Sequence, residues 1–446
     1  MLVWLLEGGR NLDQQEYDVI VVGGGFAGIT ASRDCQRHGF RTLVLEARDR
    51  LGGRTWTSEF EGESIELGGT WVYNAQPFVW SEVMRYGLEI EETPGAVPDK
   101  MILLVNGQRI VLSEAQLEEA VVGWMQFTEA VRVIVPRPYD LLHNLEAALA
   151  ADEISALTHL ETLSLSPLTH AFVKGVVELI ASGPADSVSY LDVLRFYMLG
   201  GSEFSNFMDS ASRFKLKDGT ATLLNRIAEE GGADILINTQ VTVIEDQGDQ
   251  VLVKTREGAE YRARAVVSTL PMNVIADVDF KPALPNAVLA AAQERHPGRG
   301  AKFFLKVEGH VGNIATVAPG QPINYIMTFS ESEEHTTLVA FTSDMDLVDE
   351  YDEETLQLAL TEHVPGARLI ASTMHDWNSD EFAKGTWATY RPGWAQSLIP
   401  ELHEQCGRIF FASGDHGEGW RGTIDGAIGA GVRAAESIKK ILTHPN

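Results

Sequence analysis

Near its N-terminal end the sequence has the pattern of a strand, a glycine-rich turn, a helix and a second strand that ends in an acid. Branched apolar residues lead directly into Gly-Gly-Gly-Phe-Ala-Gly at positions 23–28, which contains G-x-G-x-x-G. Gly23 permits the tight turn, Gly25 lets a pyrophosphate approach the backbone, and Gly28 lets the helix pack on the strand. Glu46 ends the second strand, where a carboxylate binds ribose hydroxyls. The unit predicts a dinucleotide site, and alone it does not separate NAD from FAD.

Length and composition describe a globular protein of two domains. At 446 residues the chain is longer than one core usually supports. No apolar stretch is long enough to span a membrane, and residues 1–16 are expected to form a loose N-terminal extension. Cys35 and Cys406 offer no disulfide framework, so a reducing cytoplasm is the expected location.

The net charge of −28 restricts the class of partner. Nucleic acid is not expected, because phosphate binding needs a basic face. An acidic surface attracts cationic small molecules, amines included, although solubility explains the same charge. The charge therefore gives only weak support for an amine substrate.

The order of expected elements predicts an α/β fold in which two domains alternate along the chain. Cofactor-type segments, like the one at the N-terminal end, occur again in the middle and at the end of the chain. They are the strand patterns near residues 235–271 and a last strand before a final helix at 424–441. The prediction is a discontinuous Rossmann-type cofactor-binding domain with an inserted α+β substrate-binding domain. The cofactor domain is assigned residues 1–76, 210–280 and 373–446, and the substrate domain residues 77–209, mostly helical, and 281–372.

Four further segments point to one family. They are Leu-Gly-Gly-Arg-Thr at 51–55, the strand with Val241, Ser-Thr-Leu-Pro at 268–271, and the stretch 410–427 with Ser-Gly-Asp and Trp-Arg-Gly-Thr-Ile-Asp-Gly-Ala. With the N-terminal unit, they make nearly the whole chain resemble the FAD-dependent amine oxidases of the monoamine oxidase type. Within that group it is most similar to bacterial nicotine and 6-hydroxynicotine oxidases, which share stretches such as Gly69-Thr70-Trp71-Val72.

The resemblance implies FAD as the cofactor. It implies that Arg54 lies beside the pyrophosphate, that the backbone of Val241 binds the adenine, and that Asp415 accepts from a sugar or ribityl hydroxyl. The helix after Thr423 should direct its N-terminus at the flavin pyrimidine ring. The expected cofactor-binding residues are Gly23, Gly25, Phe26, Ala27, Gly28, Glu46, Ala47, Arg48, Gly53, Arg54, Gly69, Thr70, Trp71, Val241, Trp377, Gly414, Asp415, Thr423 and Ile424.

Thr386 predicts that FAD is held without a covalent bond. Some monoamine oxidases tether the flavin through a cysteine at the matching position, and neither cysteine of this chain falls there. Trp71 occupies the region in which L-amino-acid oxidases place an arginine. Without a cation for the carboxylate, an amino-acid substrate is not expected.

Lys302, Trp387 and Thr423 are the expected catalytic residues. Lys302 interrupts an apolar strand, and from the strand pattern alone it could equally face solvent. The resemblance implies a lysine that is hydrogen-bonded through water to flavin N5. Trp387 is expected as one aromatic wall of the substrate site, although core packing is its commoner role. The second wall falls at Thr423, which is not aromatic and leaves room for a bulkier or cyclic amine.

Several other residues are weaker candidates. Tyr73 and Trp420 could line the pocket, and His416 and Glu418 could shape the site at the flavin edge. His375-Asp376 could form a catalytic pair, but it reads more simply as the end of a strand. No His/Cys cluster has metal-ligand spacing, so no metal is expected.

The resulting hypothesis is a flavin-dependent amine oxidase that acts on a neutral secondary or cyclic, nicotine-like amine. A hydride passes from the α-carbon to N5, the imine or iminium hydrolyses, and H2O2 forms if oxygen, rather than another acceptor, reoxidises the flavin. One alternative is a primary-amine or polyamine oxidase, with Glu203 or Glu418 deep in the pocket. Others are a desaturase or protoporphyrinogen-oxidase-like enzyme and a non-catalytic FAD protein. No membrane partner is expected, and a homodimer is possible.

Overall fold

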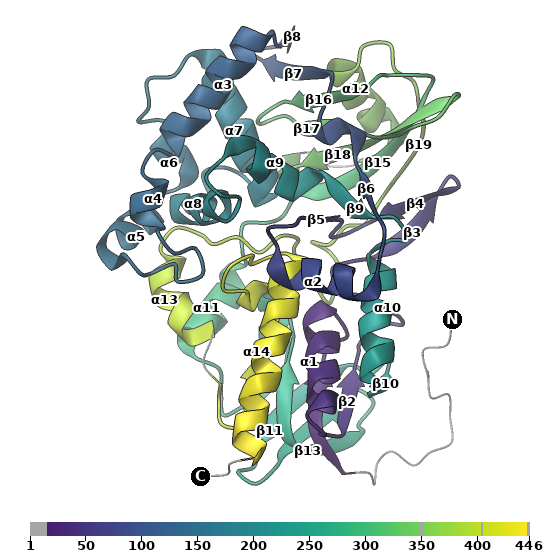
Figure 1. Cartoon of the computed structure of the whole chain (residues 1–446), viewed down its shortest axis with the longest axis vertical. Coiled ribbons are helices and arrows are strands. Elements are labelled where there is room, and N and C mark those ends of the chain that lie inside the picture. Colours follow the sequence, from purple (N-terminus) through teal and green to yellow (C-terminus); the bar gives the residue numbers. More distant parts are fainter. Residues whose placement is uncertain (1–15, 348–350, 403–404, 444–446) are drawn as a thin grey trace.

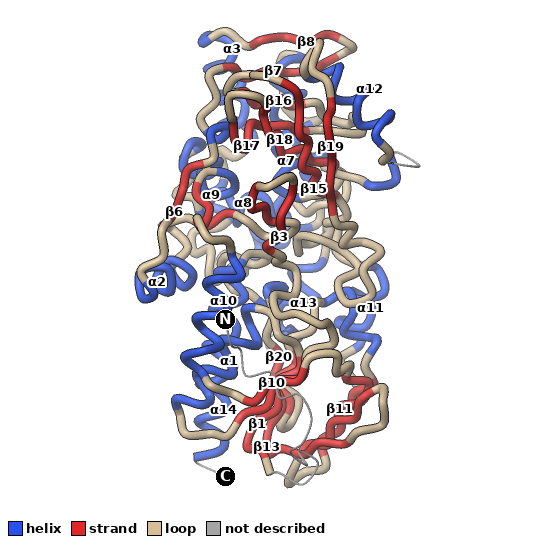
Figure 2. Tube along the Cα trace, turned by 90° about the vertical axis from the view of Figure 1, so that its right-hand side faces the viewer, coloured by secondary structure: helices blue, strands red, loops and turns tan. Residues whose placement is uncertain are grey.

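The protein is described by a computed structural model that covers residues 16–347, 351–402 and 405–443. Figures 1 and 2 show two sheets separated along the long axis, each with its own helices. Apart from Glu16, the expected N-terminal extension lies outside the described residues. In the described part, none of the helices is both long and apolar enough to cross a membrane.

The first sheet contains the predicted nucleotide-binding unit. β1 (Tyr17–Val22) lies between β2 (Thr42–Leu45) and β13 (Glu260–Ser268), parallel to both. Parallel strands need cover on both faces, and β1 and β2 are almost wholly apolar and buried. The remaining strands are β10 (Asp234–Leu236), β11 (Val241–Asp246), β12 (Val251–Thr255), β14 (Asp279–Lys281) and β20 (Ile409–Phe411), and the expected hairpin of β11 and β12 is confirmed.

Helices cover both faces of this sheet. α1 (Phe26–Arg37), α10 (Thr220–Gly231) and α14 (Ile424–Thr443) lie side by side on one face, joined by apolar contacts to Val19 and Val21. α11 (Asn286–Glu294) and α13 (Trp394–Leu402) share a core with Ile20 and Val22 on the other face. The predicted α/β fold with a Rossmann-type core is therefore confirmed, whereas the division into five segments stays a prediction.

The second sheet is mainly antiparallel. Its order is β19 (Leu369–Met374), β15 (Ala301–Glu308), β18 (His335–Thr342), β17 (Tyr325–Glu331), β16 (Ile314–Val317), β7 (Lys100–Val105) and β8 (Gln108–Val111). β7 and β8 lie in the stretch that was expected to be mostly helical. Asn106 and Gly107, both at positive φ, form the turn between them, which is the usual chemistry of a two-residue hairpin.

Most helices of the stretch 77–209 pack beside this second sheet (Figure 1). They are α3 (Glu114–Phe127), α4 (Val131–Ile134), α5 (Leu145–Asp152), α6 (Ala156–Leu160), α7 (Pro167–Ala181), α8 (Tyr190–Leu199) and α9 (Phe204–Ser212), with α12 (Glu353–His363) from later in the chain. The connecting region holds α2 (Pro77–Tyr86), the hairpin of β3 (Thr57–Phe60) and β4 (Glu63–Glu66), and a small sheet of β5 (Trp71–Val72), β9 (Phe214–Leu216) and β6 (Ile90–Glu92).

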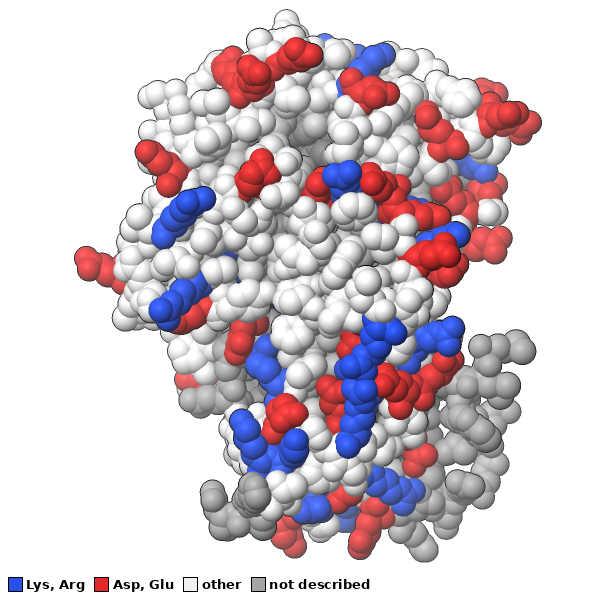
Figure 3. Space-filling model, viewed as in Figure 1, with Lys and Arg blue, Asp and Glu red and all other residues white. Residues whose placement is uncertain are grey.

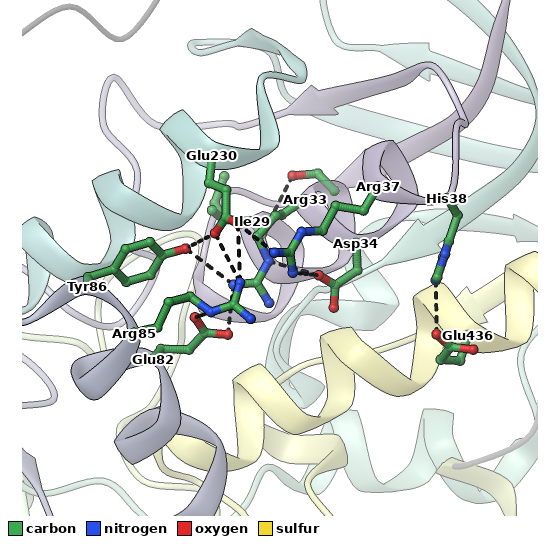
Figure 4. A network of polar contacts seen from close by, with 11 residues as sticks. Ile29, Arg33, Asp34, Arg37, His38, Glu82, Arg85, Tyr86, Glu230 and Glu436 are labelled. Atoms are coloured by element: carbon green, nitrogen blue, oxygen red, sulfur yellow. Dashed lines mark hydrogen bonds and ion pairs between the residues drawn. The ribbon is translucent and has the colours of Figure 1, made fainter.

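Charged side chains join the helices around α1. Figure 3 shows basic and acidic side chains interspersed over the lower half of this face. In Figure 4, Arg33 of α1 reaches Glu82 of α2 at 2.7 Å. Glu230 of α10 receives Arg37 of α1 at 2.6 Å and Arg85 of α2 at 3.2 Å. The network ties α1 to α2 and α10.

Candidate active site

A cavity of about 300 Å³ opens at the carboxyl ends of the parallel strands. Val22, Leu45, Thr269 and Ser413, which end or follow β1, β2, β13 and β20, line it. Ligands of open α/β sheets bind at this edge. From there the cavity extends to Lys302 on β15 of the second sheet, so both halves of the molecule contribute to it.

The glycine turn leaves space for a diphosphate. A Cβ on Gly28 would lie 2.0 Å from the carbonyl oxygen of Gly23, so only glycine lets α1 start this close to β1. Across the turn, a Cβ on Gly25 would have no atom nearer than 3.8 Å. Phe26 and Ala27, the first residues of α1, line the cavity. No side chain caps the first N–H groups of this helix at its N-cap residue, Gly25. The free N–H groups suit a pyrophosphate.

Glu46 lies where a ribose would be bound. Its Oε2 accepts from the N–H of Gly24 at 2.6 Å, and its Oε1 accepts from the N–H of Arg48 at 2.8 Å. Burial raises the pKa of this carboxyl, and the two backbone bonds oppose that change. Each oxygen keeps a second lone pair for a hydroxyl donor. With the turn, this carboxyl makes the site fit the adenosine diphosphate half of FAD.

Asp415 departs from its predicted role. It is fully buried and does not line the cavity, because its carboxylate binds Arg54 on one side and accepts from the N–H of Met272 at 2.8 Å on the other. Burial alone would raise its pKa, but the Arg54 guanidinium, His296 and the N–H of Met272 together outweigh burial and hold the pKa below its usual range. Asp415 therefore positions Arg54, whose other nitrogen donates to the carbonyl of Thr386 at 2.9 Å.

Lys302 faces the cavity rather than solvent. Its side chain is buried on β15, and burial lowers its pKa to about 7, with only partial opposition from Glu66. Its Nζ lies 5.4 Å from the ring centroids of both Trp71 and Phe304. An amine with these surroundings can change its charge near neutral pH, unlike an exposed lysine.

Trp387 and Thr423 both line the cavity. The indole of Trp387 lies against Gly422, where an added Cβ would be only 2.3 Å from its Cδ1. The hydroxyl of Thr423 donates to the carbonyl of Trp420 at 2.6 Å and accepts from the N–H of Gly426 at 3.2 Å. Its hydroxyl is thus used within the chain, and because its side chain is small, Thr423 narrows the cavity less than an aromatic residue would.

Replacement of Gly422 by alanine is expected to displace Trp387. The new methyl group would collide with the indole, so we expect any reaction in this cavity to slow by about tenfold or more while a nucleotide cofactor is still bound. Gly393→Ala is the matched control, because Gly393 has the same φ of +82° but open space around it. Equal rates for the two variants would show that backbone strain, rather than the position of Trp387, determines the effect.

Nearly all of the predicted site residues meet at this cavity. Gly28 and Asp415 are the members of the predicted set that do not line it. Of the weaker candidates, the Tyr73 hydroxyl donates to Asn206, Trp420 is buried with its N–H on the carbonyl of Ala75, and Glu418 pairs with Arg433. His375 and Asp376 directly follow β19, as the strand-end interpretation predicts; His375 contacts Asp380, and Asp376 accepts from the N–H of Asn378. His416 is likewise outside the cavity lining and bonds Ser413.

Several residues that line the cavity were missed from the sequence. Gln76, Ser182, Ser210 and Phe341 come from four separate segments that carry no shared motif. Within the described residues, the carboxylates that line the cavity are Glu46, Asp277 and Glu381, and the last two pair with Lys384 and Arg256. Glu203, suggested for a polyamine, instead caps α9.

Comparison with known proteins agrees with this geometry. The family model described as flavin containing amine oxidoreductase matches residues 26–439. The chain is 37% identical to a pseudooxynicotine dehydrogenase from Pseudomonas sp, over 97% of this chain and 88% of that protein. It is 29% identical to an (S)-6-hydroxynicotine oxidase from Paenarthrobacter nicotinovorans, over 95% of this chain and 99% of that protein. A structure of putrescine oxidase bound to putrescine superimposes with a TM-score of 0.82 at 22% identity, over 95% of this chain and 99% of that one.

Proposed function

Because the chain belongs to the flavin containing amine oxidoreductase family, we propose that it oxidises a neutral secondary or cyclic amine of the nicotine type. The observation that carries the proposal is the pair of Trp387 and Thr423 at the cavity, one aromatic and one small. The names of the nicotine-related relatives support the same substrate class.

We propose that FAD is bound without a covalent bond. The glycine turn, Glu46, Arg54 and the N-terminus of α14 would hold it, and bound FAD would supply the hydride acceptor. Thr386 supports non-covalent binding, because its side chain is a hydroxyl that pairs with Ser182 at 3.0 Å and is no nucleophile for the flavin.

The chain's own residues would bind and orient the amine. The indole of Trp387 offers a flat apolar surface for a ring, and the space beside Thr423 accepts a second ring or an N-alkyl group. Burial of Lys302 among aromatic rings keeps bulk water away from the reacting carbon and favours the neutral amine that can lose a hydride. Water then hydrolyses the iminium product to a carbonyl compound or opens its ring.

Anaerobic bleaching of the flavin absorbance tests this proposal. The purified holoprotein would be mixed with nicotine, 6-hydroxynicotine, N-methylated aminoalkyl pyridines, putrescine, benzylamine and phenylalanine. We expect a pyridyl or cyclic amine to bleach the flavin fastest. Faster bleaching by putrescine or benzylamine would overturn the substrate class and leave the amine oxidase assignment intact.

The electron acceptor is tested by admitting oxygen to the reduced protein. One relative is named a dehydrogenase and the other an oxidase, so the names leave both acceptors open. Rapid recovery of the flavin absorbance with stoichiometric H2O2 would assign oxygen. Slow recovery in air, with fast recovery on addition of an artificial one-electron acceptor, would assign another redox partner.

A further inference from the structure

Two oxygen atoms of one short turn hold the amine of Lys302. Its Nζ donates to the carbonyl of Gly68 at 2.6 Å and to Oγ1 of Thr70 at 2.5 Å. The Thr70 hydroxyl has a single proton, which it donates to the same Gly68 carbonyl at 3.0 Å. With its proton on the Gly68 carbonyl, the Thr70 hydroxyl acts as the acceptor for Lys302.

The turn that carries both acceptors is itself held in place. The N–H of Gly69 donates to the carbonyl of Arg54 at 3.0 Å, and the indole N–H of Trp377 donates to the carbonyl of Leu67 at 2.9 Å. A Cβ on Gly68 would lie 2.0 Å from the Arg54 carbonyl oxygen. The acceptors are thus anchored to the segment that holds Arg54, and Thr70 has little freedom to move away from Lys302.

The Lys302 amine has a third hydrogen-bonding position, which neither Gly68 nor Thr70 uses and which is available to a group in the cavity. An ammonium group has three N–H donors, and a neutral amine has two donors and one lone pair. With two donors satisfied by Gly68 and Thr70, the third position is an N–H in the charged form and a lone pair in the neutral form. Trp71 and Phe304 contact the amine through their ring faces, which attract the ammonium form more weakly than an oxygen acceptor would.

We propose that Thr70 is a positioning residue for amine oxidation, which holds the Lys302 amine so that its third hydrogen-bonding direction faces the interior of the cavity. The proposal rests on the proposed function and adds a role for Thr70 that differs from cofactor contact. In this proposal the hydroxyl of Thr70 acts on the reaction through Lys302, and this role is distinct from any contact that the backbone of the same turn makes with the cofactor.

The charged surroundings of Lys302 make this role measurable. Within the described residues, Glu66 of β4 is the charged group that acts on Lys302, and its carboxylate is occupied by Thr57 and by Thr220 at the start of α10. Loss of the Thr70 acceptor removes a charge-assisted bond from the ammonium form but a weaker bond from the neutral form. The pKa of Lys302 should therefore fall in Thr70→Val and return toward normal in Thr70→Ser.

The test compares wild-type holoenzyme with Thr70→Val, which keeps the shape, Thr70→Ser, which keeps the hydroxyl, and Lys302→Met. Two quantities are measured across pH: the limiting rate of anaerobic flavin reduction by the best amine, and the absorbance of the oxidised flavin without amine. We expect Thr70→Val to slow reduction about tenfold or more and to move the midpoint of both profiles to lower pH, with Thr70→Ser close to wild type. Lys302→Met should abolish the midpoint.

Four outcomes would each overturn the role of Thr70 or the proposed function. An unchanged rate and midpoint in Thr70→Val, or a flavin absorbance whose pH dependence is the same in Lys302→Met as in wild type, overturns the role of Thr70. A lower melting temperature in Thr70→Val without a change of midpoint assigns Thr70 a structural role only and also overturns it. If no amine reduces the wild-type flavin, the proposed function fails, while the absorbance titration still decides whether Thr70 controls Lys302.

Discussion

Lys302→Met will slow anaerobic reduction of the flavin by roughly 100-fold or more, the range over which positioned proton-transfer groups contribute. Methionine keeps the length and apolar contacts of the side chain but removes every hydrogen bond to Gly68 and Thr70. The cavity would keep its shape and lose the single lysine amine among the described residues that line it. Stopped-flow absorbance with saturating amine measures the effect.

Lys306→Met is the matched control for this prediction. Lys306 lies four residues further along β15, on the same side of the strand, and its Nζ donates to the carbonyl of Glu61 at 3.2 Å. It does not line the cavity, so we expect a near wild-type rate. A Lys302→Met protein that binds FAD and reduces it as fast as wild type would refute a role for this lysine in the reaction.

The predicted site residues that the structure brings together most directly at the cavity are those encoded by neighbouring residues. The turn at 23–28 and Glu46 lie within one strand-helix-strand unit, so local spacing alone determines that they converge. Arg54 follows two glycines in the same stretch. In this unit the hydrophobic pattern of the strand, the glycines of the turn and the position of the acid all indicate the same local structure. Such a segment can therefore be interpreted from the sequence.

The parts that were missed depend on contacts between distant segments. Asp415 was expected to face a sugar, and only the fold shows that Arg54, 361 positions away, occupies its carboxylate. The strands β7 and β8 were missed because their register is set by β16, more than 200 residues later, although the Asn106-Gly107 turn was a usable local signal. Ser182 and Phe341 reach the cavity through such long-range pairings and have no pattern of their own.

A second set of distant contacts links Trp387 and Thr423, the two proposed walls of the substrate site. Asp192 on α8 binds the guanidiniums of Arg195, at 2.8 Å, and of Arg421, and it accepts from the N–H of Tyr390 at 2.9 Å. Tyr390 follows Trp387 by three residues, and Arg421 precedes Thr423 by two. On the same helix, Phe196 packs edge-on against Trp387 and Trp420, with ring centroids 5.5 and 5.3 Å apart. One helix therefore orders both walls.

Asp192→Asn is expected to destabilise the protein by roughly 3–5 kcal/mol, because it leaves two buried guanidiniums without a counter-charge. The two arginines are at most 3% exposed, and they outweigh burial enough to hold the Asp192 pKa below its usual range. A control is Asp209→Asn, which breaks the half-exposed pair with Arg213 at 2.9 Å and should cost less than about 1 kcal/mol. Urea unfolding of the holoprotein, followed by tryptophan fluorescence, measures both.

Arg421→Met distinguishes charge balance from simple loss of contacts. Its removal leaves Asp192 and Arg195 as a balanced buried pair, so it should cost less than Asp192→Asn, even though Arg421 also stacks on the ring of Tyr390 at 3.3 Å. The double variant Asp192→Asn, Arg421→Met should then be more stable than Asp192→Asn alone, because one uncompensated cation is gone. Strict additivity of the two single changes would show that Asp192 and Arg421 act independently, and that α8 does not couple the Trp387 and Thr423 walls through this ion cluster.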